Sequence, residues 1–216
     1  MAEVDRDTTE QEELARLLGE ELSEVAWFAA RLLERTGAYS VLCPGCGRGE
    51  CSAFLARRGF RVTAYDVSER TCALVTRTAE LLGVQVDCFS DDMIMPRRDL
   101  RHFDAIFSEN VLHQMRPSQR RALLRSFHRA LRTSGILIVS VLSMEDERYG
   151  FGREIEVDTF DGGSGEGIHF YSAPELHAEL SEFFEVTQIE EMEETHTHFG
   201  GKQRYRLLVA TGVKFD

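Results

Sequence analysis

Short β-rich runs and longer helical patterns alternate along the chain between residues 39 and 142. The longer segments repeat apolar residues with a period near 3.6, which is typical of amphipathic helices. Because strands separated by helices pair in parallel through right-handed crossovers, the alternation predicts an α/β fold. The predicted strands are Ser40–Cys43, Arg61–Tyr65, Gln85–Phe89, Ala105–Ser108 and Ile136–Val141, and the predicted helices are Cys51–Arg58, Glu69–Leu82 and Pro117–Arg132.

Two amphipathic helices are predicted before this alternation begins. The segments TTEQEELARLL and SEVAWFAARLLERTG place apolar residues at i, i+3, i+4 and i+7, so each has one apolar face. Trp27 and Phe28 lie in the second segment and are predicted to be packing residues. An alternative interpretation is that this helix forms the roof of a ligand pocket.

The pattern changes after Ser143. The glycine-rich segment YGFGREIEVDTFDGGSGEG is too long for a simple connection in a compact domain, and such loops are usually functional lids or disordered segments. A short helix is predicted at Pro174–Leu180. Two β-rich runs, FFEVTQIEEMEE and RYRLLVATGVKF, then flank a glycine pair and predict an antiparallel hairpin that completes the sheet.

The composition is that of an ordinary globular protein with one buried core, since 43% of the 216 residues are hydrophobic and 29% are charged. A net charge of -12 opposes binding to nucleic acid and to anionic membranes, because both need lysine and arginine to neutralise phosphates. The Arg-rich stretch at residues 116–132 is predicted to be the polar face of a helix.

The N-terminal segment is acidic and lacks the basic and apolar regions of a secretion signal. No later stretch approaches the ~20 apolar residues that a membrane span requires. We therefore expect a soluble, cytoplasmic protein. Five cysteines, an odd number, in a chain without such a signal indicate reduced thiols rather than structural disulfides.

The segment VLCPGCGRGECSAFLARRGFRVTAYDVSE carries the strongest functional signal. Gly45, Gly47 and Gly49 form a turn between a strand and a helix, where they let the backbone approach a ligand closely. Asp66 ends the next strand and can accept hydrogen bonds from a ribose diol. Glu50 stands where the dinucleotide fingerprint has its third glycine, which disfavours a pyrophosphate and favours a positively charged sulfonium cofactor.

These features resemble the first two motifs of class I S-adenosylmethionine-dependent methyltransferases. VDCFSDDMIMP resembles the third motif, FDAIFSENVLHQM the fourth and GILIVSVLS the fifth strand, so the resemblance covers roughly residues 38 to 142. It implies S-adenosylmethionine as cofactor, S-adenosylhomocysteine as product, adenine contacts from Asp92 and Met93, and ribose binding by Asp66. The cofactor-binding residues that it implies are Cys43, Pro44, Gly45, Cys46, Gly47, Gly49, Asp66, Val67, Asp92, Met93, Ser108, Glu109 and Asn110.

One position departs from the family pattern. Most members carry an acid at the end of the first strand, whereas this chain has Cys43 followed by Pro44, which removes a usual acceptor near the cofactor's ammonium group. A similar Pro-Gly-Cys-Gly turn occurs in methyltransferases resembling the thiopurine, thiol and halide types. The C-terminal part shows a looser resemblance to the tellurite-resistance-like branch, which suggests a small nucleophilic or polarizable acceptor.

Several polar residues are candidates for positioning that acceptor or for taking its proton. His169 and Tyr171 alternate after the glycine-rich segment and are expected on one side of the strand. His113 lies in the fourth motif, near the cofactor's reactive end or as a structural cap. A thiolate acceptor needs no base, whereas a hydroxyl or an amine could give its proton to His169, His113 or Glu109. Tyr149 and Arg153 flank the glycine-rich segment and are weaker candidates.

No metal site is predicted. Cys43, Cys46 and Cys51 have a spacing that suggests zinc, but no second C-x2-C supplies the remaining ligands. His196 and His198 share a face in an extended segment and are interpreted as exposed turn residues, with metal or substrate binding as the alternative.

The fold class predicted from pattern and resemblance together is a Rossmann-like three-layer α/β sandwich. Its mostly parallel seven-stranded sheet is closed by a C-terminal antiparallel hairpin and preceded by N-terminal helices. A single domain is expected. It comprises N-terminal helices at 1–37, a cofactor-binding core at 38–142, a lid or substrate loop at 143–172, and a C-terminal helix and hairpin at 173–216.

The predicted function is methyl transfer to a small molecule by in-line displacement, in a monomer or homodimer. The lid is predicted to close over acceptor and cofactor. A non-catalytic protein that binds S-adenosylmethionine or S-adenosylhomocysteine is the first alternative, because Cys43 replaces the usual acid. A nicotinamide-dependent oxidoreductase is disfavoured by the missing third glycine and by the closing hairpin.

Overall fold

The computed structural model describes residues 22–163, 165, 167–198 and 201–215. The first of the two predicted N-terminal helices lies outside these residues. The second is helix α2 (Glu24–Thr36), whose first turn is capped by the Ser23 hydroxyl accepting from the backbone N–H of Ala26. Gly37 ends it in the left-handed conformation.

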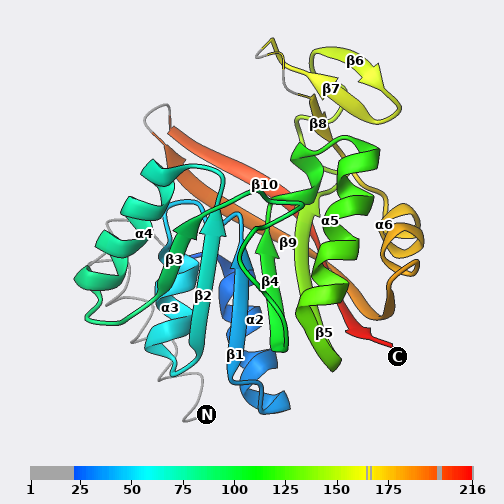
Figure 1. The fold of residues 1–216 in the computed structure, drawn as a ribbon. Helices are drawn as coiled ribbons and strands as arrows, with labels where there is room; N and C mark the ends of the chain where they lie inside the picture. Colours follow the sequence, from blue (N-terminus) through cyan, green and yellow to red (C-terminus); the bar gives the residue numbers. More distant parts are fainter. Residues whose placement is uncertain (1–21, 164, 166, 199–200, 216) are drawn as a thin grey trace, which may run out of the picture.

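The main sheet has seven strands in the order β3-β2-β1-β4-β5-β10-β9 (Figure 1). The pairs from β3 to β5 are parallel, whereas β10 is antiparallel to both β5 and β9. The predicted mostly parallel sheet with a closing hairpin is therefore confirmed. The strands are β1 (Ser40–Pro44), β2 (Arg61–Asp66), β3 (Asp87–Ser90), β4 (Phe103–Glu109), β5 (Leu131–Leu142), β9 (Phe184–His198) and β10 (Gly201–Lys214).

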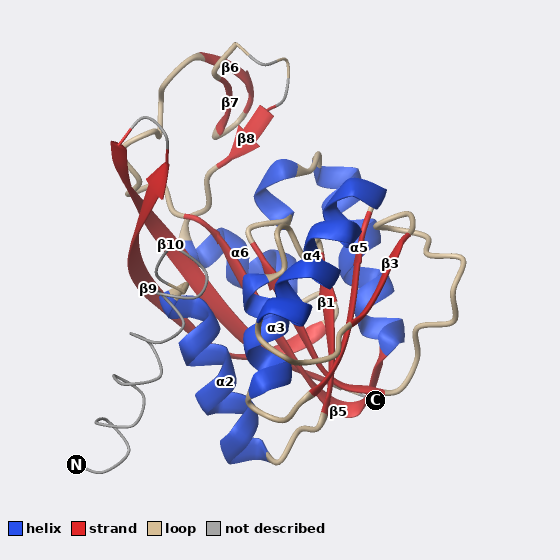
Figure 2. Cartoon of the chain, turned by 90° about the vertical axis from the view of Figure 1, so that its left-hand side faces the viewer, coloured by secondary structure: helices blue, strands red, loops and turns tan. Residues whose placement is uncertain are grey.

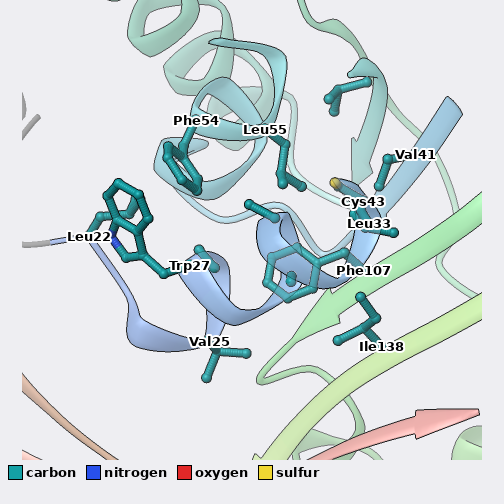
Figure 3. Close-up of a cluster of buried hydrophobic side chains, with 14 of the residues drawn as sticks. Leu22, Val25, Trp27, Leu33, Val41, Cys43, Phe54, Leu55, Phe107 and Ile138 are labelled. Carbon is teal, nitrogen blue, oxygen red and sulfur yellow. The ribbon is translucent and has the colours of Figure 1, made fainter. Parts of the chain in front are cut away.

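Helices cover both faces of the sheet and make it the middle of three layers. Alternate residues of β1 divide between two apolar clusters, with Val41 and Cys43 on the face covered by α2 and α3, and Leu42 on the face covered by α5 and α6. Figure 3 shows the first cluster, in which the Trp27 ring lies 4.6 Å from that of Phe54, centroid to centroid. The helices are α2, α3 (Glu50–Arg57), α4 (Glu69–Leu81), η1 (Leu112–Gln114), α5 (Pro117–Ala130) and α6 (Ala173–Leu180).

Most predicted boundaries agree with the structure to within a few residues. The larger differences lie around β5, which begins at Leu131 because that residue already has extended backbone angles and ends α5 there. His196 and His198 lie in strand β9, paired with Gln203 and Gly201, so the prediction that they are turn residues is wrong. The strand continues to the tip because Thr197 and its neighbours find partners along β10.

The glycine-rich segment after Ser143 is not a structureless loop. It contains three short antiparallel strands in the order β6-β7-β8 (Arg153–Glu156, Thr159–Asp161 and Gly167–His169). Figures 1 and 2 show this small sheet standing beyond the carboxyl ends of the parallel strands. Its turn at Asp158 has a φ of 55°, and a single bridge between Ser143 and Tyr171 ties its base to the end of β5.

Within the described residues, every helix is too short or too polar to cross a membrane.

Candidate functional site

The site lies at the carboxyl ends of the parallel strands, beside β1, from which the strand order runs outward in both directions. Ligands of open α/β sheets gather at this position. The loop after β1 approaches its neighbours too closely for side chains. A Cβ on Gly45 would lie 2.4 Å from Val111 Cγ2, and one on Gly49 would lie 2.7 Å from the Cα atom of Val75. Both glycines also have positive φ, which only glycine adopts without strain.

Two hollows adjoin this loop. The inner chamber, of about 220 Å³, lies between the ends of β1 and β4 and is roofed by Leu22 and Ser23 at the start of α2. The outer chamber, of about 820 Å³, extends from the end of β2 to η1 and the small sheet. The two chambers share the wall residues Gly45, Gly47, Glu109 and Asn110. Leu22 and Ser23 precede α2, and no residue of the helix itself lines either chamber, whereas Trp27 is buried in the core. The structure therefore favours the prediction that Trp27 is a packing residue over the alternative in which this helix forms the roof of a pocket.

Ten of the predicted cofactor-binding residues line these chambers. They come from the carboxyl ends of β1, β2, β3 and β4 and the loops that follow, which the parallel topology brings to one edge. Gly49, Asp92 and Ser108 do not line them: Gly49 packs on α4, Asp92 Oδ1 accepts hydrogen bonds from the next turn, and Ser108 is buried in β4. The residues that line the chambers are Cys43, Pro44, Gly45, Cys46, Gly47, Asp66, Val67, Met93, Glu109 and Asn110.

Glu109 carries an acidic group into the inner chamber. Its Oε1 accepts a hydrogen bond from the Ser23 hydroxyl at 2.5 Å, and its Oε2 accepts one from the Cys51 thiol at 2.9 Å. The Ser23 hydroxyl also lies 2.7 Å from Oε1 of Glu194, a buried carboxylate on β9. Sequence reasoning missed Ser23 and Glu194, because neither belongs to the motif segments.

Two cysteines of the inner chamber, Cys43 and Cys51, have a raised pKa. Burial raises the pKa of Cys43 to about 12, and the negative charge of Glu109 adds to this shift. Burial also raises the pKa of Cys51 well above its ordinary value, again with a contribution from Glu109. Within the described ranges, no group of three or more His, Cys, Asp and Glu side chains is arranged to hold a metal ion.

Two polar residues that line the outer chamber, Arg148 and Tyr205, come from outside the family motifs. Arg148 forms a bidentate ion pair with buried Asp146, in which Nε lies 2.7 Å from Oδ1 and Nη2 lies 3.0 Å from Oδ2. Its guanidinium lies 4.2 Å from the centre of the Tyr205 ring. None of these three residues was predicted as part of the site, since none lies in a family motif. The other residues that line the outer chamber, apart from the predicted cofactor-binding ones, are Val111, His113, Gln114, Met115, Gln119, Leu142, Gly167 and Ile168.

His113 lines the outer chamber but is held as a neutral hydrogen-bond donor. Its Nδ1 accepts a hydrogen bond from the backbone N–H of Leu142 at 3.3 Å, so the ring proton resides on Nε2. Burial lowers its pKa to about 3, and the positive charge of Arg148 adds to this effect. Because its one lone pair is already engaged, His113 in this arrangement is not a general base. The structure thus combines both sequence interpretations, a place at the site and a capping contact.

His169 and Tyr171 lie on one side of the chain, as alternation predicts, with their rings 4.5 Å apart. That side faces α6 and not the chambers. His169 contacts Thr159 Oγ1 at 2.9 Å and Glu175 Oε1 at 3.0 Å, and the Tyr171 hydroxyl donates to Glu179 Oε2 at 3.0 Å. Both side chains are buried and neither lines a chamber, so the geometry gives them no direct contact with an acceptor.

The weaker candidates are also placed away from the chambers. Tyr149 packs edge-on against the rings of Phe160 and Phe170, and its hydroxyl donates to Asp158. These contacts join the segment before β6 to β7 and to the residue that follows β8. Arg153 is an exposed residue of β6.

Comparison with known proteins shows which family and which fold the chain resembles. Residues 41–135 match the family described as a methyltransferase domain. A curated protein of Geobacillus sp. that is assigned to the methyltransferases is 32% identical over 111 residues, which are 50% of this chain and 44% of that protein. The chain spans less than two thirds of the length of the curated relatives that it matches.

Solved structures share the fold at low identity. TehB from Haemophilus influenzae superposes with a TM-score of 0.67 at 16% identity, over 90% of this chain and 63% of that one. The 1,6-didemethyltoxoflavin-N1-methyltransferase of Burkholderia thailandensis, with 1,6-didemethyltoxoflavin and S-adenosylhomocysteine bound, gives 0.65 at 23% identity, over 89% and 79%. The chain therefore has the class I methyltransferase fold that its motifs predict, and its residues 41–135 are similar to the methyltransferase domain.

Proposed function

We propose that this protein transfers the methyl group of S-adenosylmethionine to a small-molecule acceptor. The observation that carries the proposal is the junction of the two chambers at Gly45, Gly47, Glu109 and Asn110. The inner chamber and the end of β2 fit the cofactor, and the outer chamber is large enough for a second small molecule. The S-adenosylhomocysteine bound to the Burkholderia relative supports this choice of cofactor.

The residues present fit the separate parts of this cofactor. Asp66 ends β2 at the chamber wall, where a carboxylate can accept hydrogen bonds from ribose hydroxyls. Met93 offers an apolar surface beside Gly45 on which an adenine ring can pack. Gly45 leaves no room for a side chain, so the backbone of the loop itself faces the ligand.

The protein's contribution to the chemistry is alignment and a polar wall rather than proton removal. When bound, S-adenosylmethionine supplies an activated methyl group on a positively charged sulfur. His113 offers an N–H donor to the outer chamber, and Arg148 offers a guanidinium face. An acceptor that is already deprotonated, such as a thiolate or an acidic phenol, suits this wall, because no base is needed and the His113 N–H can donate a hydrogen bond to it.

The charge of the chain supports a small acceptor over a nucleic acid. A formal net charge of -12 repels a polyanion, and the arginines that line the chambers are engaged with acidic partners, Arg48 with Glu50 and Arg148 with Asp146. A small molecule carries far less charge than a nucleic acid, so the same net charge repels it much more weakly.

Calorimetric titration of the wild type with S-adenosylmethionine and S-adenosylhomocysteine tests the proposal. We expect micromolar binding that Asp66→Ala weakens by about tenfold or more, because the ribose loses a charged acceptor. Thiols, phenols and amines are then screened for methylation. Absence of binding by the folded wild type would overturn the proposal.

The same titrations separate the alternatives. A protein that binds S-adenosylhomocysteine tightly but methylates none of the acceptors would favour a non-catalytic binding role. Binding of NADH, included as a control, would favour an oxidoreductase. Glu50, at the first position of α3, stands where a pyrophosphate would need a glycine and argues against that outcome.

A further inference from the structure

Two cysteine side chains meet beside the glycine loop. Sγ of Cys46, in the middle of that loop, lies 4.0 Å from Sγ of Cys88 on β3. Ala64 of β2 pairs with Cys43 of β1 on one side and with Cys88 on the other, so these three residues share one face of the sheet. Because the side chain on β2 between the two outer strands is only a methyl group, Cys46 in the loop after β1 reaches Cys88 across it.

Cys46 is the member of the pair that faces the site. It is partly exposed and lines the inner chamber, whereas Cys88 lines neither chamber. Two other cysteines, Cys43 and Cys51, also line the inner chamber. Burial raises the pKa of Cys43 to about 12 and the pKa of Cys51 well above its ordinary value, which makes both poor nucleophiles near neutral pH. Cys46 is the remaining thiol that a small oxidant meets in this chamber.

The loop has room for the two sulfurs to come together. A disulfide holds its sulfurs about 2.05 Å apart, so this pair has to close by about 2 Å. Gly45, before Cys46, is held by the hydrogen bond from its N–H to the Tyr65 carbonyl at 2.8 Å. A Cβ on Gly47, after Cys46, would meet nothing within 4 Å. The movement is therefore expected on the side of Gly47, which belongs to the wall of both chambers.

A third cysteine, Cys72 of α4, is a rival partner for Cys88. The hydrogen bond with Cys46 and then burial raise the pKa of Cys88, whereas the contact with Cys72 lowers it. Burial raises the pKa of Cys72 itself to about 11. Cys72 lines neither chamber, so an oxidant that enters the site does not meet it first.

We propose that Cys46 and Cys88 form a reversible disulfide when a hydroperoxide reaches the inner chamber, and that this disulfide lowers the affinity of the site for its cofactor. The Cys46 sulfur attacks one peroxide oxygen and becomes a sulfenic acid, and the other oxygen leaves as water or an alcohol. The Cys88 sulfur then attacks the sulfenic sulfur, and its hydroxyl leaves with the Cys88 proton as water. Two thiols are oxidised and one peroxide is reduced.

The effect on the cofactor rests on the function proposed above. A cofactor in the inner chamber would cover Cys46 and hold the glycine loop in its reduced conformation. By linkage, the factor by which the disulfide weakens cofactor binding equals the factor by which the cofactor disfavours the disulfide. A tenfold effect corresponds to about 30 mV in the reduction potential of this two-electron couple.

Peptide mapping tests the disulfide without reference to the cofactor. The purified wild type is treated with one equivalent of hydrogen peroxide, alkylated and digested with trypsin, and linked peptides are identified by mass spectrometry. The tryptic peptides are 36–48 with Cys43 and Cys46, 71–77 with Cys72 and 78–97 with Cys88.

We expect the first and third of these peptides to be linked in a form that dithiothreitol separates, and fragmentation to place the link at Cys46. Absence of any link would overturn the proposal. So would a link that joins Cys88 only to Cys72 or to Cys43.

Calorimetry tests the consequence for the site. We expect S-adenosylhomocysteine to bind the peroxide-treated wild type about tenfold more weakly than the reduced protein, and dithiothreitol to restore the affinity. Cys88→Ala removes the partner that lies outside the chambers, so it should bind within about threefold of the reduced wild type before and after peroxide. Cys72→Ala is the matched control, since it removes a neighbouring thiol but should keep the peroxide effect. Cys88→Ser replaces Cys88→Ala if that variant does not fold.

The outcomes are distinct. Unchanged affinity in a protein shown to carry the link would overturn the effect on the cofactor. A loss in Cys88→Ala as large as that in the wild type would mean that oxidation of Cys46 alone impairs the site, and would overturn the role of the disulfide. Failure of the reduced, folded wild type to bind S-adenosylhomocysteine would instead overturn the proposed function, while the peptide map still decides whether the disulfide forms.

Discussion

Acid is expected to destabilise this protein through His113. Its side chain is 5% exposed, and burial lowers its pKa from 6.5 to about 3. In the unfolded chain the imidazole regains the ordinary pKa near 6.5. Between these two values the unfolded state binds a proton that the folded state does not. The stabilisation is therefore complete above pH 6.5 and is lost progressively as the pH falls toward 3.

The magnitude follows from the unfolded state. At about pH 5 the unfolded imidazole is almost fully protonated, about 1.5 pH units below its pKa, and one such unit corresponds to about 1.36 kcal/mol. The free energy of unfolding should thus fall by about 2 kcal/mol between about pH 7.5 and about pH 5 through this group alone. The folded pKa of about 3 scarcely enters, because it lies well below this window.

A variant isolates this contribution from those of other titrating groups. In His113→Asn the amide oxygen takes the place of Nδ1 and still accepts from the backbone N–H of Leu142, but the side chain does not titrate. Urea unfolding of both proteins at both pH values gives the difference between wild type and variant. That difference should shift by about 2 kcal/mol against the wild type at the lower pH. Parallel pH dependences would refute the assignment of His113 as a buried neutral donor.

Three further predictions test other parts of the structure. Gly45→Ala should abolish cofactor binding, since its Cβ would lie 2.4 Å from Val111 Cγ2, and Val111→Ala should restore part of it in titrations of the double variant. Tyr171→Phe should lower the free energy of unfolding by about 1 to 2 kcal/mol through its lost bond to Glu179 while leaving cofactor affinity unchanged; a selective loss of affinity would contradict its placement away from the chambers. Asp104→Ala should cost about 1 to 3 kcal/mol in urea unfolding, because its carboxylate ties the starts of β1 and β5 to β4, and a neutral effect would show that these bonds contribute nothing net.

The core of the fold was predictable because its signals are local. The strand, glycine turn, helix and acid at Asp66 follow each other in sequence, and the continuous apolar run in β1 reflects the two buried faces of the sheet. The same locality explains what was missed. The chambers are also lined by Ser23, Arg148 and Tyr205, which lie outside the motifs. Only the folded topology brings these residues together.

Alternation also has an inherent ambiguity that the segment after β7 illustrates. It correctly places His169 and Tyr171 on one side, but both sides of this segment meet protein, so the period alone does not tell which side faces the ligand. The small sheet was missed for a related reason. Its strands are three or four residues long and rich in glycine and acid, so they resemble loop sequence until their partners are known.

The small sheet contributes residues to the outer chamber but not to the inner one. Among the described strands, β6, β7 and β8 pair only with one another, yet Gly167 and Ile168 form part of the outer wall. Changes within β6, β7 and β8 can therefore reshape that wall without breaking a ladder of the main sheet. Asp146 and Arg148, which precede the small sheet, contact Arg206 and Tyr205 of β10 and are expected to vary less. Homologues that keep the glycine turn are thus expected to differ most in the small sheet.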